Sequence, residues 1–132
     1  MIVVDTNIIA YLYITGDRSN QATELFKADS HWSVPTLWRS EFRNVLSQYL
    51  RNDWLSFDDA LVIIEQAEIL ISGNEYQISS TQVMNLVNSS SCSAYDCEFV
   101  ALAQQLKVPL ITADKKLLRE FADTAKSLDD YL

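Results

Sequence analysis

Short apolar runs alternate with longer amphipathic stretches along the chain, and this alternation constrains the fold more than any other feature. Five runs have the character of buried strands: Ile2–Val4, Trp32–Val34, Tyr76–Ile78, Val108–Ile111 and, with a weaker pattern, Ala125–Leu128. Strands separated by helices in this way pair in parallel, because a parallel pair needs a long crossover connection. The pattern therefore predicts an α/β protein with a parallel sheet.

The stretches between these runs repeat apolar residues at helical spacing. The expected helices are Asn7–Ile14, Ser19–Ala28, Thr36–Arg51, Phe57–Ile71, Thr81–Val87, Ala94–Leu106 and Lys115–Ala122. One start is clearly marked, because Ser56 can cap a helix whose first turn carries Asp58 and Asp59. No repeat or flexible linker divides the chain, and its 132 residues suit one domain, residues 1–132.

The charge balance and the cysteines narrow the class of protein. Eighteen acidic residues against ten basic ones give a net charge of −8, which excludes a broad electropositive surface for duplex DNA. Cys92 and Cys97 have no histidine or second cysteine pair nearby, so we expect both to be reduced and structural. We find no signal peptide and no apolar run of the ~20 residues that a membrane span needs, and we expect a cytoplasmic protein.

Four carboxylates occupy positions where a neutral or apolar residue is expected. Asp5 and Asp114 each follow a predicted strand, at the end of the sheet where parallel α/β proteins bind ligands. Glu41 and Asp96 each fall on the apolar side of a predicted helix. The two apolar stripes are Trp38, Phe42, Val45, Leu46 and Tyr49 beside Glu41, and Tyr95, Phe99, Leu102, Ala103 and Leu106 beside Asp96.

Each of these acids also has an ordinary structural explanation. Asp5 and Asp114 can cap the helices that follow them. Asp96 can favour the dipole of its own helix, while Glu41 can pair with Arg43 or lie at the water's edge. Together in one crevice, however, the four would repel one another strongly unless divalent cations lay among them. Oxygen ligands of this kind suit Mg²⁺ or Mn²⁺.

Four segments resemble, in order and spacing, the acidic motifs of the PIN domain, and especially those of VapC-like toxin ribonucleases. The segments are VVDTNII, LWRSEFRNVL, SAYDCEFVALAQQL and VPLITADKKL. The resemblance implies a catalytic quartet that also binds metal: Asp5, Glu41, Asp96 and Asp114. It further implies three supporting polar residues: Thr6, Asn7 and Thr112.

The same resemblance implies a fold, an activity and partners. The fold is a single three-layer α/β/α domain with a five-stranded parallel sheet in the order 3-2-1-4-5. The activity is that of an Mg²⁺- or Mn²⁺-dependent endoribonuclease, with RNA as substrate, a homodimer as the assembly and a small antitoxin protein as inhibitor. Since the chain is acidic, RNA would be held by the metal and by a few basic side chains near the motifs. The candidates, which can also serve only as charged surface, are Arg39, Arg43, Lys115, Lys116 and Arg119.

Other functions fit parts of the pattern. A phosphatase of the haloacid dehalogenase type begins with a strand followed by Asp-x-Asp, but Asn7 removes the second acid. A response-regulator receiver needs an aspartate after the third strand, where this chain has Ser79 and Ser80. A PIN-like binding module, or a housekeeping RNA-processing nuclease without an antitoxin, stays open. We favour a nuclease over the binding module, because an unused cluster of four carboxylates would be costly, and the resemblance to VapC-like proteins favours a toxin.

Two further sets of residues have a less specific interpretation. His31 is the only histidine, so a histidine-based ribonuclease mechanism lacks its second group, and we expect His31 at a surface or strand edge. The aromatic residues Tyr11, Tyr13 and Trp54 are candidates for a dimer or antitoxin interface, although they suit core packing as well.

Overall fold

The computed structural model describes residues 1–14 and 16–132, and its strands alternate with helices throughout that range. The strands are β1 (Ile2–Val4), β2 (Trp32–Pro35), β3 (Glu75–Tyr76), β4 (Leu110–Ile111) and β5 (Ala125–Lys126). The helices are α1 (Thr6–Tyr13), α2 (Ser19–Ala28), α3 (Trp38–Arg51), α4 (Phe57–Ile71), α5 (Ser80–Asn88), α6 (Ala94–Leu106), α7 (Lys115–Glu120) and α8 (Leu128–Tyr131).

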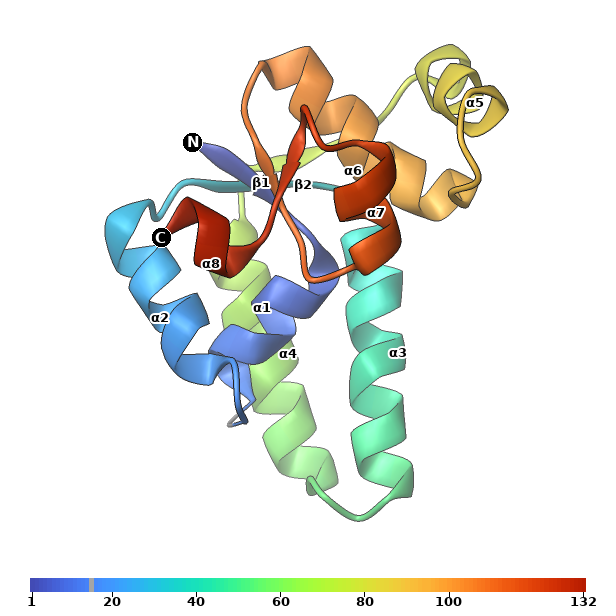
Figure 1. The fold of residues 1–132 in the computed structure, drawn as a ribbon. Helices are drawn as coiled ribbons and strands as arrows, with labels where there is room; N and C mark the ends of the chain where they lie inside the picture. Colours follow the sequence, from blue (N-terminus) through green and yellow to red (C-terminus); the bar gives the residue numbers. More distant parts are fainter. Residues whose placement is uncertain (15) are drawn as a thin grey trace.

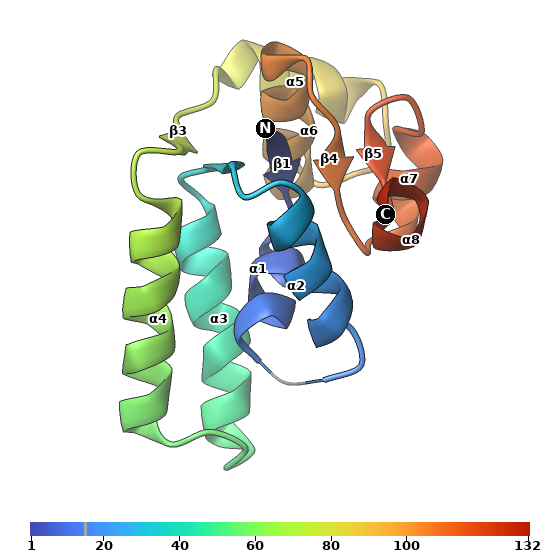
Figure 2. The same cartoon turned by 90° about the vertical axis from the view of Figure 1, so that its left-hand side faces the viewer.

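All five strands pair in parallel in the order β3-β2-β1-β4-β5, which confirms the expected sheet. Parallel neighbours are joined by right-handed crossovers. In this strand order such crossovers put α1 to α4 on one face of the sheet and α5 to α7 on the other. The direction of the chain across the sheet reverses between β1 and β4, and α3 and α4 extend side by side beyond the strands (Figures 1 and 2). The α/β/α class is therefore confirmed.

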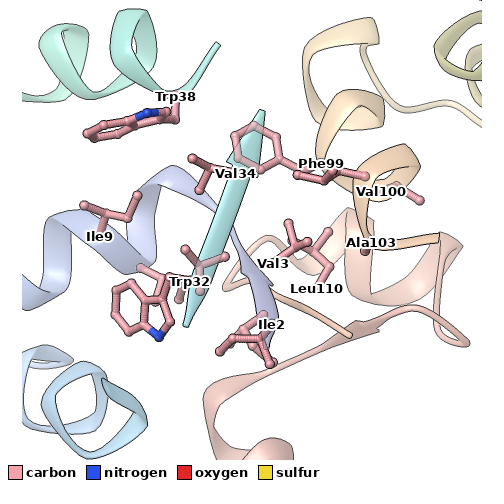
Figure 3. Close-up of a cluster of buried hydrophobic side chains, with 14 of the residues drawn as sticks. Ile2, Val3, Ile9, Trp32, Val34, Trp38, Phe99, Val100, Ala103 and Leu110 are labelled. Carbon is pink, nitrogen blue, oxygen red and sulfur yellow. The ribbon is translucent and has the colours of Figure 1, made fainter. Parts of the chain in front are cut away.

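The core consists of apolar side chains packed on both faces of the three central strands, β2, β1 and β4. Val3 and Leu110 lie in register and face Phe99 of α6, while Trp32 lies on the opposite face beside Ile9 of α1 (Figure 3). All five of these side chains are almost completely buried. Burial on both faces explains why the strands are continuous apolar runs rather than alternating ones. The packed sheet gives a rigid base for the residues that follow β1 and β4.

The predicted elements all exist, but several boundaries differ. The third strand ends at Tyr76 rather than Ile78, the fourth begins at Leu110, and α3 begins at Trp38 rather than Thr36. The prediction of a four-residue strand at Ala125–Leu128 was wrong. Strand β5 ends at Lys126, and Ser127 caps the short helix α8. Strands of two residues are too short for periodicity to define their ends.

For one residue of the predicted apolar stripes, the prediction of burial was wrong. Tyr95 is 63% exposed although its spacing puts it on the same face as Phe99, and it lies in the first turn of α6, ahead of the buried residues of that face. The remaining residues of that stripe and of the stripe on α3 are buried or half-buried, so Glu41 and Asp96 do border the core.

The cysteines and the histidine lie where the sequence predicts. Cys92 and Cys97 are both free and buried, and burial raises the pKa of Cys92 to about 11. His31 is exposed just before β2, where its Nε2 lies 3.1 Å from Asn74 Oδ1. In the part of the chain that the structure describes, we find no helix with the length and apolar character to cross a bilayer.

Candidate active site

The site begins where β1 and β4 end side by side. The backbone N–H of Asp5 donates to Ile111 O at 2.9 Å, which extends the pairing of the two strands by one residue. Thr112 Oγ1 then donates to Asp5 Oδ2 at 2.7 Å and accepts from the backbone N–H of Asp114 at 3.0 Å. Thr112 is fully buried, so this one hydroxyl fixes the first acid and the backbone of the last.

Helix α3 adds the second acid through a similar contact. Thr6 Oγ1, in the first turn of α1, donates to Glu41 Oε1 at 2.7 Å, while the backbone N–H of Thr6 donates to Asp5 Oδ1 at 2.8 Å. Thr6 is 4% exposed, which leaves its hydroxyl little choice of partner. The two threonines thus hold Asp5 and Glu41 in fixed orientations, Thr112 through Asp5 and Thr6 through both acids.

Helix α6 supplies the third acid and α7 begins at the fourth. Ser93 caps α6 by accepting from the backbone N–H of Asp96 at 3.1 Å, which places Asp96 in the first turn. Asp114 caps α7, and its Oδ1 accepts from the backbone N–H groups of Lys116 at 2.8 Å and Leu117 at 3.1 Å. The capping roles considered for Asp5 and Asp114 are therefore real, and they coexist with a place in the site.

All four carboxylates line one pocket of about 200 Å³ at the carboxyl ends of β1 and β4. The other residues of its wall are Thr6, Asn7, Asn44 and Val45. The sequence did not identify Asn44, although it follows Glu41 by three residues and so lies on the same side of α3. The spacing of a second polar residue on the Glu41 face was the signal that could have found it.

Burial and mutual repulsion make the ionised form of Asp5 unfavourable. Asp5 is only 8% exposed, and this burial raises its pKa to about 6 from the ordinary 3.8. The charges of Asp96 and Asp114 raise the pKa further, whereas the hydrogen bonds from Thr112 and Thr6 lower it. The protein thus keeps a carboxylate where desolvation opposes its charge.

Glu41 is in the same situation as Asp5. Burial raises its pKa to about 6, and the charges of Asp5, Asp96 and Glu98 act in the same direction against the hydrogen bond from Thr6. Glu98 lies on α6 outside the predicted quartet, and its influence identifies it as a fifth acid near the pocket.

Asp96 is also shifted. Burial raises the pKa of Asp96, the charge of Asp114 adds to the shift, and Ser93 and Lys116 lower it. Three acids from different elements therefore share an electrostatic penalty that a bound cation would remove.

The pocket wall has the chemistry of an Mg²⁺ or Mn²⁺ site, because the side-chain groups in it that can bind a metal are oxygens of carboxylates, amides and a hydroxyl. Within residues 1–14 and 16–132, however, no three His, Cys, Asp or Glu side chains are already gathered closely enough to form a metal-binding group. The carboxylates line the pocket without closing into a cage. The pocket therefore suits a divalent metal ion in the type of its ligand atoms and in their placement around one space.

The predicted basic residues are not part of this pocket wall. Arg39 turns away from it: its Nε and Nη2 donate to Glu75 at 2.7 and 2.8 Å, and its Nη1 lies 2.9 Å from Glu68. Arg43 and Lys115 are exposed, as are Lys116 and Arg119. Of this set, Lys116 has a resolved electrostatic effect on Asp96.

The fold and the pocket together define an α/β/α protein with a carboxylate-lined site. The site lies at the ends of β1 and β4, where the direction of the chain across the parallel sheet reverses. The chain belongs to the PIN domain family, whose model matches residues 2–125. It is 27% identical over 123 residues to Ribonuclease VapC3 of Pyrobaculum aerophilum, covering 91% of this chain and 94% of that protein.

Two solved structures share the fold. The crystal structure of PAE2754 from Pyrobaculum aerophilum matches with a TM-score of 0.76 and 17% identity over 97% of this chain and 90% of that one. A toxin–antitoxin complex from Klebsiella pneumoniae contains a chain that matches with a TM-score of 0.63 and 19% identity, covering 89% of this chain and 90% of that one. At these identities the two matches show the fold alone.

Proposed function

We propose that this protein is a cytoplasmic, Mg²⁺- or Mn²⁺-dependent endoribonuclease and the toxin of a toxin–antitoxin pair. The observation that carries the proposal is the pocket in which Asp5, Glu41, Asp96 and Asp114 meet although they are far apart in the sequence. Membership of the PIN domain family and the similarity to a VapC ribonuclease support the nuclease assignment.

The four acids would divide the work of holding the metal. Asp5 and Asp96 would bind one ion, and Glu41 and Asp114 would complete its shell through water or hold a second ion. Such an ion supplies an activated water and neutralises charge on the phosphodiester. Thr112 and Thr6 would keep Asp5 and Glu41 oriented, through the two hydroxyl contacts of 2.7 Å.

No side chain is needed as a nucleophile in this scheme. Asn7 and Asn44 have neutral amides in the pocket wall and can donate hydrogen bonds to phosphate oxygens without adding to the negative charge. The exposed cations Arg43, Lys115 and Lys116 are the proposed contacts for RNA around the pocket. Arg39 is bound to Glu68 and Glu75, so we propose that it contacts RNA only when these two ion pairs break.

The decisive experiment compares Asp5→Asn and Asp96→Asn with the unsubstituted protein on single-stranded RNA. We expect both variants to lose cleavage by at least about a hundredfold, as for a missing electrostatic catalyst, while circular dichroism shows the native fold. Asp123→Asn is the matched control, because Asp123 is exposed in the loop after α7. Full cleavage by either site variant, or cleavage by the native chain that EDTA does not reduce, would refute the proposal.

The partners are part of the same proposal. Large apolar side chains stay exposed along α4 and the turn before it: Trp54, Phe57, Leu61, Val62 and Ile69. Such a patch is typical of a surface that a partner covers. We propose that a small antitoxin covers this patch and that the toxin is a homodimer, which light scattering at micromolar concentration would detect.

The antitoxin is tested with the product of a short neighbouring reading frame. We expect its co-expression to suppress RNA cleavage, and we expect Trp54→Ser to weaken the complex, because Trp54 is 68% exposed. Met84→Ser is the control, since Met84 is also a large exposed apolar side chain, 56% exposed, but lies on α5. If the neighbouring product leaves cleavage unchanged, the chain is better described as a housekeeping nuclease.

A further inference from the structure

A second pocket of about 340 Å³ adjoins the carboxylate pocket. The two pockets share Asn7 and Val45 in their walls, so they meet. The second pocket lies where α1 packs against α2 and α3, and α1 is seen between those two helices in Figure 1. We call it the tyrosine pocket, after Tyr11 of α1 and Tyr49 of α3, which both line it.

The wall of the tyrosine pocket combines aromatic and polar groups. Tyr11 and Tyr49 are half-buried, and Tyr49 packs edge to face on Trp54 with ring centroids 5.5 Å apart, which limits the movement of its ring. Asp17 and Arg18 supply an acceptor and a cation, and the Asn7 amide can both donate and accept. The proposed active site uses none of these groups except Asn7.

This combination matches the chemistry of an unpaired nucleobase. Unpaired bases bind proteins by stacking on aromatic side chains and by hydrogen bonds at their edges. The volume is at the lower end of the range of about 300–1,000 Å³ that small-molecule sites have. On a chain with a net charge of −8, stacking is also a source of RNA affinity that does not depend on a positive surface.

We propose that the tyrosine pocket receives one base of single-stranded RNA, that of the nucleotide next to the phosphate that is cut, and thereby sets the sequence preference. The inference rests on the proposed nuclease function. Because the two pockets share a wall at Asn7, a strand whose phosphate lies at the carboxylates brings its neighbouring nucleotide to Tyr11 and Tyr49. Asn7 and Asp17 then contact the base edge, and Arg18 contacts the adjoining phosphate.

The test combines binding with cleavage preference. Binding of a fluorescent single-stranded RNA is measured by anisotropy on the uncleaving Asp96→Asn chain. In that background we expect Tyr49→Leu and Arg18→Gln each to raise the dissociation constant by about tenfold, and we expect Tyr49→Phe, which keeps the ring, to restore it. In the active chain, Tyr49→Leu should change the base preference at one position beside the cut in a randomised RNA.

Matched controls lie outside the pocket. Tyr131→Leu on α8 and Arg51→Gln at the end of α3 remove the same kinds of group, and we expect neither to change binding or preference. Unchanged binding and preference in Tyr49→Leu and Arg18→Gln would overturn the base pocket while leaving the nuclease in place. Loss of antitoxin binding in these variants with RNA binding intact would assign the pocket to the protein partner instead. A chain that neither binds nor cuts RNA would overturn the pocket and the proposed function together.

Discussion

At the scale of single residues, the acids at the strand ends have two roles at once. Asp5 and Asp114 cap the helices that follow them and also line the pocket, so the capping explanation does not exclude a functional one. The sequence predicted which four acids are unusual, because two of them follow the ends of apolar strands and two interrupt the apolar faces of helices. Asn44 was missed, since a polar residue at a helix surface carries no such contradiction and only its spacing from Glu41 points to it.

The raised pKa of Asp5 makes a prediction about stability without metal. Since the pKa is about 6 in the folded chain and 3.8 ordinarily, Asp5 favours folding below pH 4 and loses this contribution as the pH rises through 6. The loss corresponds to about 3 kcal/mol. Urea unfolding in EDTA at pH 4.5 and 7.5 should capture about 2 kcal/mol of this loss, because the Asp5 carboxyl of the unfolded chain is already largely ionised at pH 4.5.

The comparison of variants isolates the contribution of this one group. We expect the difference in unfolding free energy between Asp5→Asn and the native chain to grow in favour of the variant as the pH rises. Asp123→Asn should show no such growth, because Asp123 is exposed. If the difference in unfolding free energy between Asp5→Asn and the native chain stays constant with pH, the raised pKa of Asp5 is contradicted.

At the scale of elements, the apolar runs predicted the type and the number of the helices and strands before α8. They did not predict where each element ends. The run from Ala125 continues into α8 because Ser127 accepts from the backbone N–H of Asp130 and starts a helix. The direction of Arg39 was also hidden, because its glutamate partners lie 29 and 36 residues further along. Only the folded chain brings β3 and α4 next to the start of α3.

The Arg39 contacts predict the behaviour of this junction. Arg39 and Trp38 both donate to Glu75, which joins the first turn of α3 to β3, and the hydrogen bond from Arg39 lowers the pKa of Glu75. We expect Arg39→Met to destabilise the fold by about 1 kcal/mol at pH 7, a modest value because the guanidinium is partly exposed.

The pH dependence of this effect has the opposite sign to that of Asp5. A lowered pKa contributes stability above the ordinary value of 4.5, and that contribution is lost as the pH falls through the lowered value. The difference between Arg39→Met and the native chain should therefore shrink in acid. Arg43→Met, at an exposed position one turn further along α3, is the control. A destabilisation that is the same at pH 7 and pH 3 would show that packing, rather than the ion pair, is lost.

At the scale of the whole molecule, the α/β class followed from the apolar runs, whereas the strand order came from the resemblance to PIN domains. Periodicity says nothing about which strands are neighbours, and the placement of Asp5 beside Asp114 depends on the pairing of β1 with β4. The net charge of −8 excluded a broad basic surface, and it agrees with the proposal that metal ions, rather than many arginines, compensate the acids of the pocket. The tyrosine pocket could not be predicted, because its wall comes from three separate segments.

The central claim is that the four acids converge to bind divalent metal, and calorimetric titration of the native chain with Mn²⁺ tests it most directly. We predict saturable uptake of one or two ions per chain, abolished or strongly weakened in Asp5→Asn and Asp96→Asn and unchanged in Asp123→Asn. Absence of uptake by the folded native chain, or equal uptake by the two site variants, would contradict it.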